Sequence, residues 1–206
     1  MLRTALLLWL AVFSCQRRAG ELVDVTTVAP GIVLDVRYAT ADNFLGKPVY
    51  PVARVVLRRR VAERLARVER RLARRGLGLK VFDGYRPLSA QRAMWAARPD
   101  PRWVADPKVG SRHNRGAAVD VTLVDARGDE LPMPTAFDDM SPRAAAGADA
   151  PEPARTNRRI LAEAMTAEGF EILATEWWHF DAPDWRRWDV MDVPLDQVGA
   201  KDAGGE

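Results

Sequence analysis

The chain contains only two histidines, and each stands close to acidic residues. His113 lies in the segment SRHNRGAAVD, which ends seven residues later at Asp120, and His179 follows Glu176 by three residues in the segment EWWHF. Neutral imidazole and carboxylate suit zinc, and a catalytic zinc keeps three protein ligands and one open position. Two histidines and one acid meet that number. A further carboxylate beside the metal would take a proton from the bound water.

Asp120 stands inside the apolar segment AAVDVTLV, whose alternation predicts a strand. Val119, Val121 and Leu123 would face one way, and Asp120 would face the other way with its even-numbered neighbours. An unpaired carboxylate is costly to bury there, and a metal or another cation would offset that cost. The alternative is a loop histidine and an aspartate with ordinary polar partners. The residues alone leave both interpretations open.

The spacing of Glu176 and His179 adds a geometric condition. In a regular strand an odd offset places two side chains on opposite faces, so a shared site requires a bend, a bulge or a turn between them. Trp177 and Trp178 stand between the two residues. We expect them to pack in the core, with substrate contact as the alternative.

The segment DGYRP supplies a third chemical element. Gly84 permits a tight turn and Pro87 stiffens it, so Arg86 would be held by backbone geometry. Arginine donates to oxyanions in a fixed fork, and near a metal it would stabilise a tetrahedral oxyanion. The alternative role for Arg86 is an ordinary ion pair at the surface.

These residues need elements to position them. Apolar residues at helical spacing predict a helix over 54–75 that stops at Gly76, and LGLKVF then alternates as a strand. We expect a short helix capped by Ser89 and stopped by Pro99, and a second long helix over 154–169. Between them lies a long loop, 125–153, with a hairpin turn at 126–128. Residues 170–180 predict a final strand or a strand and a turn. This order favours an α+β fold: a mixed or antiparallel sheet with flanking helices.

The N-terminus has the layout of an export signal. Residues 1–15 combine a cationic start, an apolar run and a small residue before Cys15, which resembles a lipoprotein processing site. We therefore expect an exported protein of the periplasm or cell envelope, attached to the membrane if Cys15 is lipidated and free of it if the segment is a plain secretory signal. Cys15 is the only cysteine, which excludes an intrachain disulfide. We expect residues 16–30 to be a leader, 31–195 the single domain and 196–206 a flexible tail.

The basic character of the chain does not predict a nucleic-acid partner. The net charge is +3 and 27 of the 31 basic residues are arginine. The arginines alternate with apolar residues at helical spacing, which is typical of a solvated helix face. No nucleic-acid-binding signature accompanies them, so we expect no nucleic-acid partner.

Several segments together resemble the D-alanyl-D-alanine dipeptidases, a zinc peptidase family that includes the vancomycin-resistance dipeptidase. In chain order they are YATADNFLGKPVY, DGYRP, SRHNRGAAVDVTL, the ELPMPTAFDDM loop, NRRIL and EWWHF, over about residues 31–180. The resemblance implies a single domain similar to the D,D-carboxypeptidases and the Hedgehog signalling domain. It also implies hydrolysis of D-alanyl-D-alanine to two D-alanine molecules.

The same resemblance assigns residues to roles. One Zn²⁺ per chain would be held by His113, Asp120 and His179. Glu176 would be the general base that activates the water and then protonates the leaving amine, and Arg86 would stabilise the oxyanion. The contacts to the small D,D-dipeptide would fall on Tyr38, Asp83, Ser111 and Asp138. The oligomeric state is left open.

The chain also departs from that family's pattern. Arg112 stands where a second serine often occurs, the stretch between DGYRP and SRHNRG is short, and the segment after Asp139 lacks a histidine found in the resistance enzyme. These departures affect pocket shape and substrate range. One alternative is a D,D-carboxypeptidase or endopeptidase acting on peptidoglycan stem peptides. Another is a non-catalytic, zinc-bearing wall-binding module, against which the presence of Glu176 and Arg86 argues.

Overall fold

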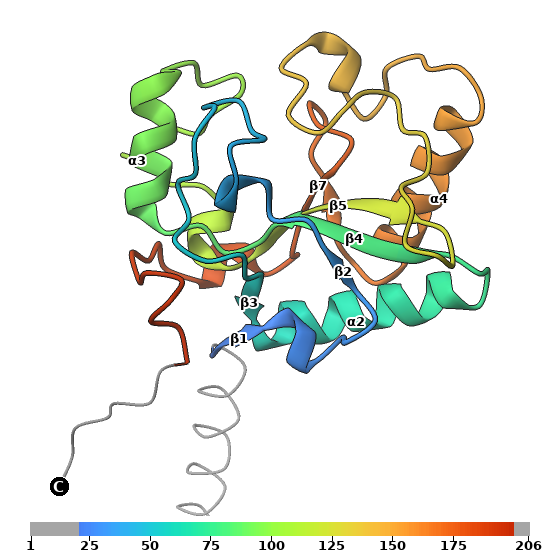
Figure 1. Ribbon diagram of the computed structural model, residues 1–206, viewed down its shortest axis with the longest axis horizontal. Helices are drawn as coiled ribbons and strands as arrows, with labels where there is room; N and C mark the ends of the chain where they lie inside the picture. The colour runs from blue at the N-terminus through green and yellow to red at the C-terminus, as the bar shows by residue number, and fades with distance from the viewer. Residues whose placement is uncertain (1–20, 200–206) are drawn as a thin grey trace, which may run out of the picture.

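The computed structural model describes residues 21–199, so the predicted signal segment and Cys15 lie outside the described residues. The described part is an α+β domain built on a mixed sheet, as predicted (Figure 1). Its strands are β1 (Leu22–Asp24), β2 (Val33–Leu34), β3 (Val56–Arg58), β4 (Gly78–Asp83), β5 (Ala118–Val124), β6 (Glu171–Ile172) and β7 (His179–Asp181). Its α-helices are α2 (Arg59–Ala73), α3 (Leu88–Ala97) and α4 (Ala154–Ala167).

The main sheet has the strand order β2-β4-β5-β7-β6. β2 runs parallel to β4, whereas the β4–β5, β5–β7 and β7–β6 pairs are antiparallel. α2 and α4 pack on each other and on this sheet (Figure 1). Val119, Val121 and Leu123 of β5 join the apolar faces of these helices in one core. The other face of β5 is left to carry Asp120, as the alternation predicted.

α2 is shorter than the helix predicted over 54–75. Its buried side recurs at helical spacing through Val61, Leu65, Val68 and Leu72, and its arginines lie on the outer side. Residues 56–58 form β3 instead, because they pair antiparallel with β1. The predicted stop at Gly76 is confirmed by a backbone φ of 69°, which glycine adopts without strain.

The folded domain is wider at both ends than the predicted 31–195. β1 lies within the predicted leader, and Val23 and Val25 are buried in the core. At the other end Leu195 and Val198 are buried, and the Arg54 guanidinium donates to both of their backbone carbonyls. These pairings are long-range, so local composition did not reveal them.

Ser89 does not cap α3, contrary to our expectation. The helix begins at Leu88, with Pro87 in the cap position and no side-chain cap hydrogen bond. The Ser89 backbone N–H instead donates to the Asp192 carboxylate at 2.7 Å. A free N–H at a helix start needs an acceptor, and here the C-terminal segment supplies it.

The segment 170–180 forms a hairpin rather than one strand. β6 and β7 pair antiparallel, and the residues between them, including Glu176, form turns. The 126–128 turn is also present, since Val124 forms a bridge with Glu130 across it. Farther along the 125–153 loop, the Phe137 ring stacks on Phe82 of β4 with centroids 4.5 Å apart.

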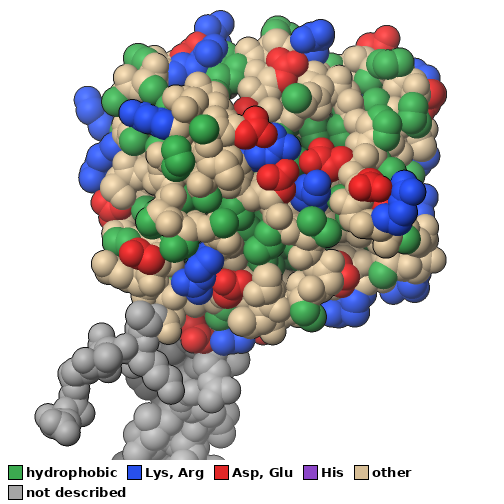
Figure 2. All heavy atoms as spheres, viewed as in Figure 1, with side chains coloured by type: hydrophobic (Ala, Val, Ile, Leu, Met, Phe, Trp, Pro, Cys, Tyr) green, Lys and Arg blue, Asp and Glu red, His purple; other side chains and the backbone are tan. Residues whose placement is uncertain are grey.

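The surface shows no broad basic face on the side seen in Figure 2, where acidic and basic side chains are interspersed. Within residues 21–199, no helix has the length and apolar character needed to span a membrane.

Candidate metal centre

The sheet register brings three acidic or imidazole side chains into one row. Asp83 of β4 lies opposite Asp120 of β5, and Asp120 lies opposite His179 of β7. Side chains directly opposite each other in antiparallel strands share a face of the sheet. His113 comes from the short 3-10 turn before β5. Gly116 closes that turn at a φ of 66°, where an added Cβ would lie 2.8 Å from Leu22.

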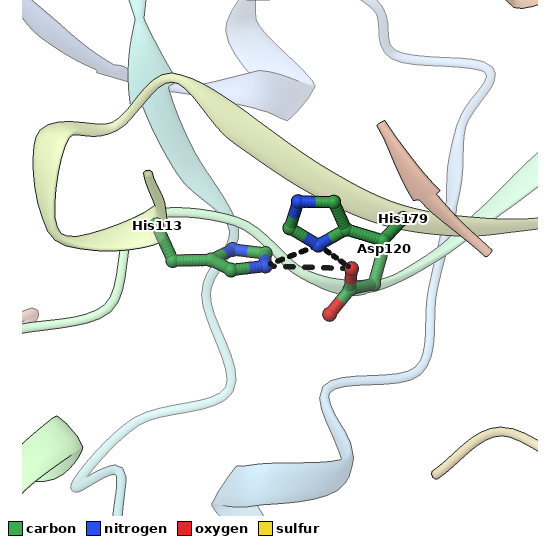
Figure 3. Close-up of side chains that lie close together, drawn as sticks. All are labelled: His113, Asp120 and His179. Atoms are coloured by element: carbon green, nitrogen blue, oxygen red, sulfur yellow. Dashed lines mark hydrogen bonds and ion pairs between the residues drawn. The ribbon is translucent and has the colours of Figure 1, made fainter. Parts of the chain in front are cut away.

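His113, Asp120 and His179 converge on one point, and all three are buried (Figure 3). His113 Nε2 lies 3.1 Å from His179 Nδ1 and 3.4 Å from Asp120 Oδ1, and the latter two atoms are 3.0 Å apart. Tetrahedral zinc with bonds of about 2.0–2.2 Å has ligand atoms roughly 3.3 Å from one another. The three atoms therefore have nearly the spacing of one face of a zinc tetrahedron.

Each histidine is oriented by a second partner on its other nitrogen. His113 Nδ1 donates to the Gly84 carbonyl at 2.7 Å. His179 Nε2 lies 3.0 Å from the carboxylate oxygen Oδ1 of Asp181, so it carries the proton of that hydrogen bond. The lone pairs of His113 Nε2 and His179 Nδ1 are thus left for a metal ion. This arrangement is the usual one at histidine metal sites.

The electrostatics favour a cation at this point. Burial alone would raise the pKa of Asp120, but the two histidines hold it well below its usual range. Burial alone would lower the pKa of His179, but hydrogen bonds to Asp120 and Asp181 raise it to about 10. A bound metal ion therefore takes the place of a proton that the site otherwise holds.

Glu176 lies at the same centre, in the turn between β6 and β7. Its Oε2 is 3.9 Å from His179 Nδ1. The chain turns at the two residues between them, as a shared site required. Burial raises the pKa of the Glu176 carboxyl. Within the described residues its carboxylate accepts no side-chain hydrogen bond at normal distance, so it is available as a base.

Arg86 lies beside the centre and is held there by side-chain hydrogen bonds, whereas the DGYRP turn predicted that backbone geometry would hold it. Its Nε and Nη2 donate to Asp83 Oδ2 at 3.1 and 2.7 Å, and its Nη1 donates to Gln91 Oε1 at 2.9 Å. A guanidinium has five N–H donors. Three are used within the described part of the chain, which leaves two for a ligand.

Asp83 is placed differently from the substrate contact that the resemblance implied. It is 1% exposed and is absent from the cavity wall. Besides Arg86, its carboxylate accepts hydrogen bonds from the Tyr50 hydroxyl and the Gly84 N–H, both at 2.8 Å. Because its oxygens are already used behind Arg86, Asp83 orients that arginine.

The other residues predicted to contact substrate line the cavity, which has a volume of about 960 Å³. The Tyr38 hydroxyl donates to Asp138 Oδ2 at 2.9 Å, and burial raises the pKa of Asp138 to about 7. Ser111 lies on the cavity wall beside His113. The backbone N–H of His113 donates to the Ser111 Oγ at 3.2 Å.

The two tryptophans of EWWHF pack in the core, as expected, and both are 3% exposed. They lie in different surroundings. Trp177 donates to the Thr135 hydroxyl at 2.9 Å, whereas Trp178 also borders the cavity. Trp178 therefore combines core packing with a place in the site wall.

Two buried residues of the site were not found from the sequence. Asp181 orients His179, and its position two residues later in the same strand was a usable signal. Gln91 joins Arg86 to the Ala105 carbonyl, to which its Nε2 donates at 2.7 Å. No local pattern marks Gln91, because its two partners come from distant segments.

The sequence of this chain matches one family of known proteins. Residues 18–196 match a family profile described as D-Ala-D-Ala dipeptidase. D-alanyl-D-alanine dipeptidases of Escherichia coli and Enterococcus faecium are 42% and 37% identical, over 79% and 74% of this chain and 85% and 87% of theirs. A solved vancomycin-resistance D,D-pentapeptidase, VanY, in complex with Zn(II), is 20% identical. That comparison covers 62% of this chain and 73% of that one, with a TM-score of 0.41.

The buried Arg86–Asp83 pair predicts a large stability effect. Replacement Asp83→Asn leaves a buried guanidinium without its charge partner, which should lower the free energy of unfolding by about 3–5 kcal/mol. The matched control is Asp35→Asn, whose Arg37 partner lies at 2.8 Å but with side chains 31% and 24% exposed. That change should cost about 1 kcal/mol or less. Denaturant unfolding measures both, and equal losses would contradict the assignment.

Proposed function

The chain belongs to the D-Ala-D-Ala dipeptidase family, and on that basis we propose that it hydrolyses free D-alanyl-D-alanine to two D-alanine molecules. One Zn²⁺ per chain would be held by His113, Asp120 and His179. The observation that carries the proposal is a single cavity. Three ligand atoms at zinc spacing, an available carboxylate and a fixed guanidinium all face it.

The metal identity is supported by the donor set. Two imidazoles and one carboxylate leave a fourth position open, as in catalytic zinc sites. When bound, the ion supplies Lewis-acid chemistry: it acidifies a water molecule and polarises the scissile carbonyl. The remaining steps belong to the residues of the chain.

Glu176 would act as the general base. Its carboxylate lies beside His179 and faces the cavity, so it would accept a proton from the attacking water. The raised pKa of the carboxyl brings it closer to working pH, which lets the protonated group later donate to the leaving amine. One side chain would thus act first as base and then as acid.

Arg86 would stabilise the oxyanion that forms during the reaction. Asp83 and Gln91 fix its guanidinium before substrate arrives, and two N–H donors remain for the developing negative charge. Preorganised donors are effective because little reorganisation is needed during the reaction. The buried Asp83 carboxylate also balances the charge of Arg86 when no substrate is bound.

Asp138, oriented by Tyr38, would bind the amino group of the dipeptide. The Asp138 carboxylate borders the cavity and is already oriented by the Tyr38 hydroxyl. An ionised carboxylate would pair with the ammonium group of a free dipeptide. An N-acylated peptide lacks that charge, so this pair would favour the dipeptide over longer peptidoglycan stems.

Metal dependence gives the direct test of the proposal. Chelation should abolish release of D-alanine from D-alanyl-D-alanine, because the three ligand residues cannot by themselves acidify water, and added Zn²⁺ should restore it. Metal analysis should find one ion per chain. Undiminished turnover after verified metal removal, or no turnover with zinc bound, would reject the proposal.

Replacement Glu176→Gln should lower kcat by at least about 10²-fold, because the amide cannot accept the proton. Zinc content should be unchanged, since the three ligands are intact. The replacement Glu171→Gln, at an exposed residue of β6, provides the control and should leave kcat unaltered. Near-normal kcat in Glu176→Gln would show that another group is the base.

Lowering the pH through about 7 should raise KM for D-alanyl-D-alanine, because a protonated Asp138 no longer holds the substrate ammonium. Asp138→Asn should raise KM by about 10-fold or more and flatten this pH dependence. The same variant should change turnover of an N-acylated D-Ala-D-Ala peptide little. If the wild-type enzyme hydrolyses both substrates equally well, the D,D-carboxypeptidase alternative is favoured.

A further inference from the structure

Asp181 occupies a buried position directly behind one proposed metal ligand. It follows His179 by two residues in β7, so both side chains lie on the same face of the sheet. Its strand partners on that face are Ala118 of β5 and Glu171 of β6. Asp181 is 4% exposed, so its charge requires close partners.

The two oxygens of this carboxylate have different partners. Oδ1 lies 3.0 Å from His179 Nε2, on the side of the ring away from Asp120. Oδ2 lies 3.3 Å from Nε of Arg112. A carboxylate held at both oxygens cannot rotate freely, and it therefore fixes the plane of the His179 ring.

Arg112 is itself held in place. Its guanidinium lies 4.8 Å from the centre of the Trp185 ring, a cation–π distance. It directly precedes His113 and borders the cavity, with its side chain 38% exposed. Arg112 is thus placed to compensate the charge of Asp181 without being a metal ligand.

We propose that Asp181 is a positioning residue of the metal centre and that Arg112, stacked on Trp185, holds Asp181 in turn. Asp181 keeps the proton of His179 on Nε2, so that Nδ1 presents its lone pair to the metal. The carboxylate also makes the imidazole a stronger ligand. Loss of such a partner typically costs about 10–100-fold in metal affinity.

The inference rests on the proposed function only for the presence of the metal, so the test measures metal retention without substrate. Zn²⁺ affinity is determined by competition with a chromophoric chelator for wild type, Asp181→Ala, Asp181→Asn and Arg112→Gln. The control is Arg115→Gln. Arg115 also borders the cavity and lies 5.7 Å from the Trp185 ring, but its hydrogen bond goes to the Trp188 carbonyl.

Asp181→Ala should weaken Zn²⁺ binding by about 10–100-fold. Asp181→Asn should have a smaller effect in the same direction, because the amide oxygen still accepts from Nε2 but carries no charge. Arg112→Gln should also weaken binding, and Arg115→Gln should not. In the Co²⁺-substituted proteins, the visible absorption bands should shift for the Asp181 variants and not for Arg115→Gln.

Wild-type affinity and an unshifted Co²⁺ spectrum in the Asp181 variants would overturn the proposal. Equal losses in the Asp181 variants and Arg115→Gln would also overturn it, because the effect would then be general. If Asp181→Ala does not fold by circular dichroism, the nearly isosteric Asp181→Asn decides. Wild-type protein that retains zinc but leaves D-alanyl-D-alanine intact would refute the proposed function and not this inference.

Discussion

The burial of the Asp120 carboxylate in the central strand is the constraint on which the rest of the site depends. β5 is covered on both faces and Asp120 is only 3% exposed, so this charge is largely removed from water and must be compensated by neighbouring groups. The two histidines supply that compensation, together with the cation that their free nitrogens would bind. Both histidines of the chain thus lie beside Asp120, which is the only acidic residue of β5.

The same requirement extends outward through a series of fixed partners. His113 is held by the Gly84 carbonyl, His179 by Asp181, and Arg86 by Asp83 and Gln91. These groups are preorganised by hydrogen bonds within the protein, so little motion is needed to meet a ligand. Glu176 differs, because its side chain is partly exposed beside the centre and its carboxylate has no hydrogen-bond partner among residues 21–199. That freedom suits a group that must gain and lose a proton.

Much of the fold could be predicted because its main elements carry local patterns. The apolar stripe of α2, the alternation of β5 and the glycine stop at residue 76 all reflect nearest-neighbour geometry. The errors occurred where distant segments intervene. β1 and β3 exist because they pair with each other, and α3 is capped by Asp192 from the C-terminal segment rather than by Ser89.

The sequence by itself determined which chemical groups are available: two histidines, the acids near them and an arginine in a stiff turn. These types and spacings left a metal site and ordinary polar partners both open, and the resemblance to the dipeptidase family then assigned the three ligands. Only the tertiary structure decided which groups meet. The register of β4, β5 and β7 placed Asp83 opposite Asp120 and behind Arg86 instead of in the cavity, and it placed Asp120 opposite His179. Asp83 and Asp120 are far apart in the chain, as are Asp120 and His179, so each pair meets only when the strands that carry it pair in the folded sheet.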